Sequence, residues 1–191
     1  MRMKGKQKRR KVILSVIIIL IVLLAAMISG GVALPKHYYG DKTEILKSAT
    51  AQTEKALIVY QPSLTSASHD IAYAIAGGLN ASGYEVTVSY PGEHLSTDIS
   101  AYSIIVFGSP NYGGSVAVPL TEYVKQIDDF TGKKVILFST FGLDGSIKPE
   151  LDKLAALLYG IEPYATVKYR FNEEETNNAA AYQLGVDAAG T

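Results

Sequence analysis

The feature that most constrains the fold of this chain is a series of short apolar runs separated by helical patterns. Three runs are nearly unbroken, as expected of strands covered on both faces: Ala56–Tyr60, Ser103–Phe107 and Lys134–Phe138. Two further segments, Tyr84–Tyr90 and Tyr164–Phe171, alternate apolar and polar residues, which is typical of half-covered edge strands. The sequence therefore predicts an α/β fold, a doubly wound five-stranded parallel sheet with the order 2-1-3-4-5.

Apolar residues also recur at helical spacing between the strands, and each stripe stops or starts at a residue that favours a helix end. The stripes are Ile71, Ile75 and Leu79 before Gly83; Leu120, Tyr123, Val124 and Ile127 after Pro119; and Leu151, Leu154 and Leu158 between Pro149 and Gly160. Asn172, followed by three acidic residues, predicts the start of a last helix because acids offset the helix dipole there. The connection Pro91–Ala101 is too short for a long helix.

The N-terminal third has a different character. Residues 1–11 contain seven basic side chains and no acid, and residues 12–34 form an uncharged stretch of 23 residues. As a helix this stretch would span about 34 Å, enough for a hydrocarbon core of about 30 Å. A cleaved signal peptide is the competing interpretation, but its apolar core would exceed the usual length of about 7–15 residues.

We therefore predict four segments. Residues 1–11 form a basic cytoplasmic segment, 12–34 a transmembrane helix, 35–55 a linker or stalk, and 56–191 the folded domain. Because basic flanks stay in the cytoplasm, the protein is expected at the cell membrane as a single-pass protein, with its domain outside the cytoplasm.

Charge and composition exclude several functions. From Ala56 onward the chain has 15 acidic and 7 basic residues, and an acidic domain does not suit nucleic acid as a partner. The chain has no cysteine, so it has no disulfide and no thiolate metal site. The sequence shows no pattern typical of a catalytic Ser/His/Asp triad or of a metal cluster. His69 and His94 are expected at the surface.

Three polar segments follow predicted strands and should meet at one edge of the sheet. The first, Pro62–Ser68, carries four hydroxyls beside the start of a helix, whose free N–H groups can bind an anion. An N-cap alone would need only one of these hydroxyls. No Lys or Arg occurs between Lys55 and Lys125, which excludes a P-loop lysine here. A phosphate bound at this loop would be held by hydroxyls and backbone amides.

The second segment reads GSPNYGG over residues 108–114, and the third reads STFG over residues 139–142. Glycines allow the backbone to approach a planar ligand closely, and Tyr112 can stack on one face of it. Phe141 is the candidate for the other face. The alternative for Tyr112 is an anchor of its own loop.

These three segments resemble the flavodoxin family. Ser63-x-Thr65-Ser66-x-Ser68 is similar to the family's S/T-x-T-G-x-T phosphate loop for flavin mononucleotide (FMN), with Ser66 at the usual glycine. The resemblance covers Ala56 to about Gly185 and implies FMN as the cofactor. The cofactor-binding residues it implies are Ser63, Thr65, Ser66, Ala67, Ser68, Ser109, Pro110, Asn111, Tyr112, Gly113, Gly114, Ser139, Thr140, Phe141 and Gly142.

The resemblance implies a membrane-tethered FMN protein that carries electrons to or from a redox partner protein that the sequence does not name. Two alternatives stay open. The first is an FMN-dependent NAD(P)H reductase, because Pro110–Asp128 also resembles the loop and helix of that related group. The second is a flavin-free flavodoxin fold that serves as an interaction module.

Overall fold

The computed structural model describes residues 16–18, 40–49, 54–111, 113–142 and 149–190. The chain divides into a first unit, Met1–Tyr38, and a second unit, Tyr39–Thr191. Residues 16–18 are helical, and the rest of the predicted span at 12–34 lies outside the described residues. Among the residues that are described, no helix combines the length and the apolar character needed to cross a membrane.

The second unit alternates strands and helices, as the sequence pattern predicts. Its elements are β1 (Thr43–Leu46), β2 (Lys55–Tyr60), α2 (Ala67–Ala81), β3 (Glu85–Ser89), β4 (Ile104–Pro110), α3 (Val118–Val124), β5 (Lys134–Phe141), α4 (Glu150–Ala155), the 3-10 helix η1 (Ala156–Leu158), β6 (Ala165–Arg170) and α5 (Glu174–Gly190). Gly83 and Gly160 follow helices with positive φ angles of 99° and 89°, so both predicted helix ends are confirmed.

The strands form one six-stranded sheet with the order β1-β3-β2-β4-β5-β6. The five strands from β2 to β6 are parallel to one another and have the predicted order, with β2 at the position of the first strand. The predicted strand count is wrong, because β1 adds a sixth strand that runs antiparallel to β3. This strand lies inside the segment 35–55, for which we predicted only a linker or stalk.

The role predicted for the alternating segment Tyr84–Tyr90 is also wrong. It forms β3, which lies between β1 and β2 rather than at an edge. Its polar residues Thr87 and Ser89 are buried, and Ser89 Oγ hydrogen-bonds the carbonyl of Lys42 at 2.8 Å and Thr43 Oγ1 at 2.9 Å. The alternation therefore reflects hydroxyls that are paired inside the fold, not a face exposed to water.

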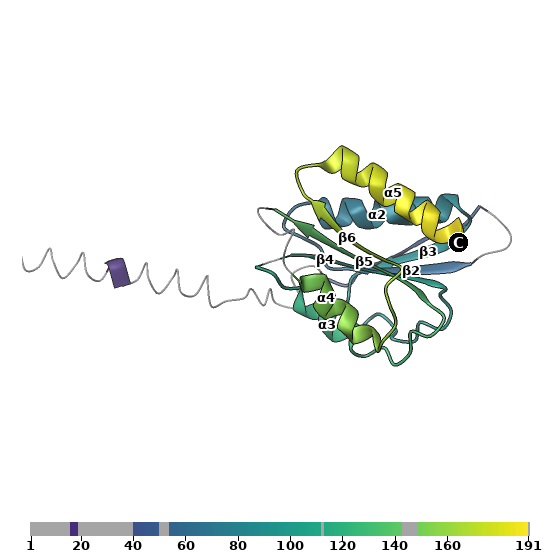
Figure 1. Cartoon of the computed structure of the whole chain (residues 1–191), viewed down its shortest axis with the longest axis horizontal. Helices are drawn as coiled ribbons and strands as arrows, with labels where there is room; N and C mark the ends of the chain where they lie inside the picture. Colours follow the sequence, from purple (N-terminus) through teal and green to yellow (C-terminus); the bar gives the residue numbers. More distant parts are fainter. Residues whose placement is uncertain (1–15, 19–39, 50–53, 112, 143–148, 191) are drawn as a thin grey trace, which may run out of the picture. The chain divides into compact units, whose positions relative to one another are not determined.

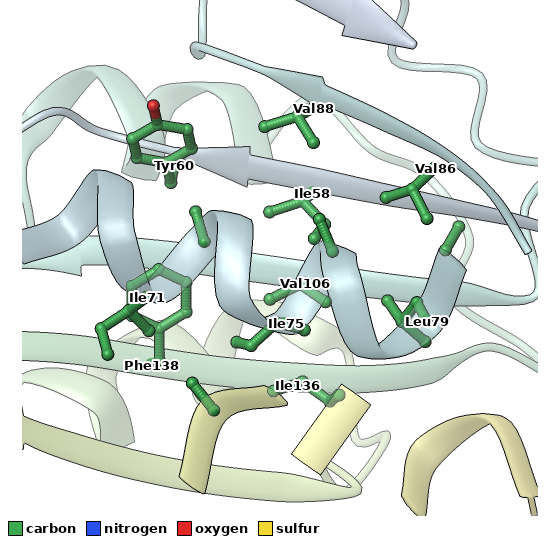
Figure 2. Packing of buried hydrophobic residues seen from close by; sticks show 14 of the residues in the cluster. Ile58, Tyr60, Ile71, Ile75, Leu79, Val86, Val88, Val106, Ile136 and Phe138 are labelled. Atoms are coloured by element: carbon green, nitrogen blue, oxygen red, sulfur yellow. The ribbon is translucent and has the colours of Figure 1, made fainter. Parts of the chain in front are cut away.

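The sheet is covered on both faces (Figure 1). Helices α2 and α5 lie over one face and α3 and α4 over the other. Figure 2 shows how Ile71, Ile75 and Leu79 of α2 point into the sheet, where they pack against apolar side chains of four strands. Burial of both faces explains the unbroken apolar runs of β2, β4 and β5.

Helices α2 and α5 approach backbone to backbone through two glycines. A Cβ atom on Gly78 would lie 2.1 Å from the carbonyl oxygen of Tyr182, and one on Gly185 would lie 2.4 Å from that of Ile75. No side chain fits at either position. A Cβ atom on Gly77, one residue away, would lie 3.5 Å from the ring of Tyr182, which is an ordinary contact distance.

Candidate functional site

The three polar segments meet at one edge of the sheet, as predicted. Strands β2, β4 and β5 are parallel and in register, with Tyr60 opposite Gly108 and Pro110 opposite Thr140. The segments that follow these strands therefore lie side by side at the carboxyl ends. We call this side of the sheet the ligand edge. Because β3 lies on one side of β2 and β4 on the other, the winding reverses here, which is where such sheets bind ligands.

The hydroxyl-rich loop leads directly into α2. Thr65 and Ser66 are exposed, and Ser63 is partly exposed. Ser63 Oγ donates a hydrogen bond to the carbonyl of Thr65 at 2.6 Å, which holds the loop as a compact turn. Ser66 has φ −71° and ψ −13°, an ordinary right-handed conformation, so serine in place of the usual glycine causes no backbone strain.

Ser68 differs from the other hydroxyls of this loop. Its side chain is fully buried, and its Oγ atom lies 2.8 Å from Thr140 Oγ1 at the end of β5. This bond ties the first turn of α2 to the third predicted segment. The structure thus brings Ser68 and Thr140 together, with their hydroxyls turned toward each other and away from solvent.

Three rings, those of Tyr60, His69 and Tyr73, pack together next to the hydroxyl-rich loop. Tyr60, the last residue of β2, shares a hydrogen bond of 2.8 Å between its hydroxyl and Nδ1 of His69. The His69 ring also stacks on Tyr73, with centroids 4.2 Å apart. Burial raises the pKa of Tyr60 above its ordinary value, so its hydroxyl stays protonated. His69, expected at the surface, is half-buried in this cluster.

The glycine-rich segment leaves β4 as a fixed turn. Ser109 is fully buried, and its Oγ atom accepts the N–H of Ala117 at 2.9 Å and donates to the carbonyl of Pro110 at 2.8 Å. Gly113 and Gly114 have φ angles of 67° and 87°, the left-handed region that favours glycine. The predicted stacking residue Tyr112 lies outside the described residues.

Asn111 is held at both its backbone and its side chain. Its N–H donates to the carbonyl of Thr140 at 2.8 Å, and its Oδ1 atom accepts the N–H of Gly114 at 2.7 Å. Its Nδ2 atom is buried and has no hydrogen-bond partner among the described residues. An unpaired buried amide donor is unfavourable unless something accepts its hydrogens.

The third segment is the end of β5. Phe141 is buried, and the Arg170 guanidinium lies 5.7 Å from the centre of its ring. A Cβ atom on Gly142 would lie 2.6 Å from the ring of Phe171, so this glycine makes room for a neighbouring side chain. The residues that follow, 143–148, lie outside the described residues.

A buried ion pair flanks this third segment, and no local sequence pattern predicts it. Ser139 Oγ donates to Glu150 Oε1 at 2.8 Å, and Lys168 Nζ lies 3.2 Å from Glu150 Oε2. Glu150 is fully buried in the first turn of α4, and Lys168 comes from β6. The hydrogen bond between Ser139 and Glu150 therefore joins the described residues on either side of 143–148, and Lys168 ties β6 to the same carboxylate.

Two cations, Lys168 and Arg170, thus lie at the ligand edge although residues 56–124 contain none. They come from the last strand, and only the pairing of β6 with β5 brings them here. Within the described parts of the chain, no three His, Asp or Glu side chains are placed to hold a metal ion.

With this geometry, the second unit has the flavodoxin-like fold, an α/β fold with a mostly parallel sheet. A flavodoxin from Streptococcus pneumoniae is 20% identical, with a TM-score of 0.60 over 71% of this chain and 98% of that one. A flavodiiron core from Synechocystis is 21% identical, with a TM-score of 0.63 over 73% of this chain.

The flavodiiron match spans only 36% of the flavodiiron chain, so this protein corresponds to about a third of it. An azoreductase from Bacillus anthracis is 13% identical, with a TM-score of 0.53 over 71% of this chain and 98% of that one. No protein-family model matches the chain, and no curated protein matches it. These likenesses establish the fold.

Proposed function

We propose that this chain is a membrane-tethered, FMN-binding electron-transfer protein. The observation that carries the proposal is the meeting of two unlike loops at the switch point of the sheet. One offers hydroxyls at a helix N-terminus, and the other offers glycines and an unpaired buried amide. A phosphate and a planar heterocycle, the two ends of FMN, are the ligand groups that such loops suit.

The phosphate end fits the hydroxyl-rich loop. The exposed hydroxyls of Thr65 and Ser66 and the partly exposed Ser63 surround the start of α2, whose 15 residues give it a full dipole. Because residues 56–124 contain no Lys or Arg, this end would be held without an ion pair. Ser68 contributes through its backbone and through the bond that fixes α2 to Thr140.

The ring end fits the segment that follows β4. The Nδ2 atom of Asn111 is a hydrogen-bond donor, which suits the carbonyl oxygens and ring nitrogens of an isoalloxazine. The left-handed glycines 113 and 114 leave room for close approach, since among the described residues, the chain neighbours of Gly113 aside, no atom lies within 4 Å of a Cβ placed on Gly113. Tyr112 keeps its predicted role of stacking on the ring, and Phe141 is the candidate for the other face.

FMN, when bound, supplies one- and two-electron redox chemistry, and the protein sets its potential. The domain from Ala56 onward has 15 acids and 7 bases, which disfavours a negatively charged reduced flavin and lowers the potential. The Arg170 guanidinium lies beside Phe141, and its positive charge acts in the opposite sense.

The azoreductase likeness keeps the second candidate, an FMN-dependent NAD(P)H reductase, in view. Arg170 gives that candidate a cation at the ligand edge, which sequence reasoning did not find. Oxidation of NADPH by the purified protein with FMN separates the two. An electron carrier should leave NADPH unoxidised unless a separate reductase is added, whereas a reductase should oxidise it alone.

The experiment that tests the flavin itself uses the full chain purified in detergent. Added FMN should bind in a one-to-one ratio, with its fluorescence quenched by stacking. Asn111→Leu should weaken the binding of FMN, while the surface variant Thr131→Ala should leave it unchanged. Absence of binding at micromolar protein would favour the flavin-free interaction module instead.

The anchor and its orientation are part of the proposal. Seven basic residues ahead of an uncharged stretch of 23 residues favour a span with the N-terminus in the cytoplasm. Protease added to intact cells should then digest the domain. Protection of the domain until the membrane is broken would reverse the orientation, and release of a soluble mature domain would indicate a signal peptide.

A further inference from the structure

Strand β1 determines where the chain joins the folded domain. It pairs antiparallel with β3, with Thr43 opposite Ser89 and Leu46 opposite Val86. Because β3 runs toward the ligand edge, like the other parallel strands, β1 starts at that edge and runs away from it. Residues 40–42 therefore lie at the ligand edge. This attachment point is a property of the domain alone.

The attachment point is held firmly. The carbonyl of Lys42 accepts hydrogen bonds from the N–H of Tyr90 at 3.0 Å and from Ser89 Oγ at 2.8 Å. Asp41 Oδ1 lies 3.1 Å from Nδ1 of His94 in the loop after β3. The ammonium of Lys42 lies 5.1 Å from the centre of the ring of Tyr73 in α2. Each of these contacts fixes the incoming chain at the start of β1.

The same contacts lead to the candidate site. The ring of Tyr90 meets the ring of Tyr60 edge-on, with centroids 5.2 Å apart. Tyr60 is the last residue before the hydroxyl-rich loop, and it shares a hydrogen bond with His69 in the first turn of α2. The point where the chain arrives is thus connected to the candidate phosphate loop through two side chains.

A chain without β1 would join the sheet at Lys55, the start of β2. That residue lies at the opposite edge, since β2 has six residues and spans about 20 Å. The strand β1 and the connection after it reverse the direction of the chain. They move the point where the chain enters the sheet from that opposite edge to the ligand edge.

The predicted span ends at residue 34, and eight residues, 35–42, separate it from the start of β1. Fully extended, eight residues reach at most about 29 Å. We propose that the anchor holds the domain by its ligand edge, so that the proposed flavin site exchanges electrons with a redox protein embedded in the same membrane. This inference rests on the proposed function, and it names the class of partner.

The charge of the domain indicates that the partner at the ligand edge is a protein and not the lipid surface. The domain from Ala56 onward carries eight more acids than bases, so anionic headgroups would repel it. Two exposed apolar side chains follow strands β2 and β4: Leu64 in the loop after β2, and Val118 at the start of α3, which comes after the loop that leaves β4. Such isolated apolar residues at a site mouth suit contact with a protein surface.

The test uses the full chain, which contains no cysteine and can therefore carry single labels. Ser115→Cys and Ala101→Cys place exposed thiols beyond opposite ends of β4, a strand of seven residues that spans about 20 Å. Each variant is labelled with a fluorescent donor and reconstituted in phosphatidylcholine vesicles that contain a headgroup-labelled acceptor lipid. Energy transfer should be several-fold stronger from position 115 than from position 101.

A matched variant tests the cause. An insertion of about 20 Gly and Ser residues between Tyr39 and Gly40 makes the linker flexible and lets the domain turn. It should reduce the difference between the two labels. Equal transfer from both positions in the chain without the insertion, or stronger transfer from position 101, would overturn the proposed attachment.

The partner class has its own readout. The reduced full chain is reoxidised by right-side-out membrane vesicles from the cell that makes it, and separately by water-soluble ferricyanide. The insertion should slow reoxidation by the membranes and leave the ferricyanide rate unchanged. Equal membrane rates with and without the insertion would overturn the membrane-embedded partner.

Failure of the proposed function gives different results. A chain that does not enter vesicles overturns the anchor and this inference together. A chain that shows stronger transfer from position 115 but binds no FMN overturns the flavin and the redox partner, while the attachment at the ligand edge stands.

Discussion

The buried pair Glu150–Lys168 gives the sharpest prediction for the third segment of the site. Glu150 is fully buried, and its two oxygens are satisfied by Ser139 and by Lys168. The side chain of Lys168 keeps 24% of its surface exposed, against 0% for Glu150. We consider three variants: Lys168→Met, Glu150→Gln and the double variant that combines them.

The unequal exposure of the two partners sets the magnitudes. Lys168→Met leaves a carboxylate with no access to water, and such a loss costs about 3–5 kcal/mol of unfolding free energy. Glu150→Gln keeps an acceptor for Ser139 and leaves an ammonium that can reach water, so its cost should be smaller, about 1–3 kcal/mol. The double variant leaves no unpaired charge and should be more stable than Lys168→Met alone.

The assay is urea unfolding followed by far-ultraviolet circular dichroism, because the chain has no tryptophan to serve as a fluorescent probe. A fragment that begins at Gly40 keeps all the described strands. If the two single variants cost the same and the double variant costs their sum, the pair is not coupled and the reasoning is refuted. In the FMN assay, Lys168→Met should weaken FMN and riboflavin alike, since the pair flanks the ring segment and not the phosphate loop.

Three further predictions concern other parts of the domain. Ser63→Ala combined with Thr65→Ala should weaken FMN about 10²-fold or more, because each hydrogen bond to a charged group contributes about 1.5–3 kcal/mol. Riboflavin, which lacks the phosphate, should bind this variant as before, and equal losses for both ligands in titrations would place the phosphate elsewhere. Gly78→Ala should destabilise the domain by about 3 kcal/mol, the upper end of the usual range for overpacked sites, because its Cβ would lie 2.1 Å from a backbone oxygen. Gly77→Ala should be neutral or stabilising by up to about 1 kcal/mol in the same urea experiment, and a similar loss in both would contradict the helix contact. Burial raises the pKa of Tyr169 to about 12, so the folded state keeps this proton where an unfolded tyrosine, at about 10, releases it. The stability that this pKa shift contributes is fully present below pH 10 and falls by about 2–3 kcal/mol as the pH rises to 12. In unfolding measurements the decline should be smaller by this amount in Tyr169→Phe, and the remaining decline comes from Tyr60 and Tyr123, whose pKa values burial also raises.

The five parallel strands could be predicted from the sequence because burial of a strand requires a recognisable pattern of apolar residues. Strands covered on both faces carry nearly unbroken apolar runs, and β2, β4 and β5 do so over residues 56–60, 104–107 and 135–138. Strand β1 has no such pattern, since three of its four residues are exposed. It is held by side chains distant in sequence: the amide of Asn80 donates to the carbonyls of Leu46 and Lys47, and the hydroxyl of Tyr73 to Glu44.

The strand that the sequence did not predict, β1, has an experimental consequence. A fragment that begins at residue 50, which the sequence pattern alone would suggest, lacks β1 and exposes the edge of β3. We expect it to be less stable in urea than the fragment that begins at Gly40, and more prone to aggregate. Equal stability of the two fragments would mean that β1 contributes little.

The site was predictable in its location but not in its internal bonds. Glycine and hydroxyl residues after apolar strands identify the ligand edge, because parallel strands bring their carboxyl ends together. The bond between Ser68 and Thr140 joins residues 72 positions apart, and Glu150 meets Lys168 from 18 positions away. No local pattern signals such pairs, so a hydroxyl that fits a motif by spacing turned out to be buried.

The close crossing of α2 and α5 has a consequence for the order in which the domain can fold. The two glycines that allow it, at 78 and 185, are separated by more than a hundred residues of chain. Contacts between such distant positions form late, because the intervening loop must first be closed. Until the last helix has been synthesised, α2 lacks the helix that packs against it, and one face of the sheet is only partly covered. A chain that stops before α5 would therefore present a nearly finished sheet to the folding machinery, and ribosome-bound intermediates of that length should be the ones that chaperones recognise.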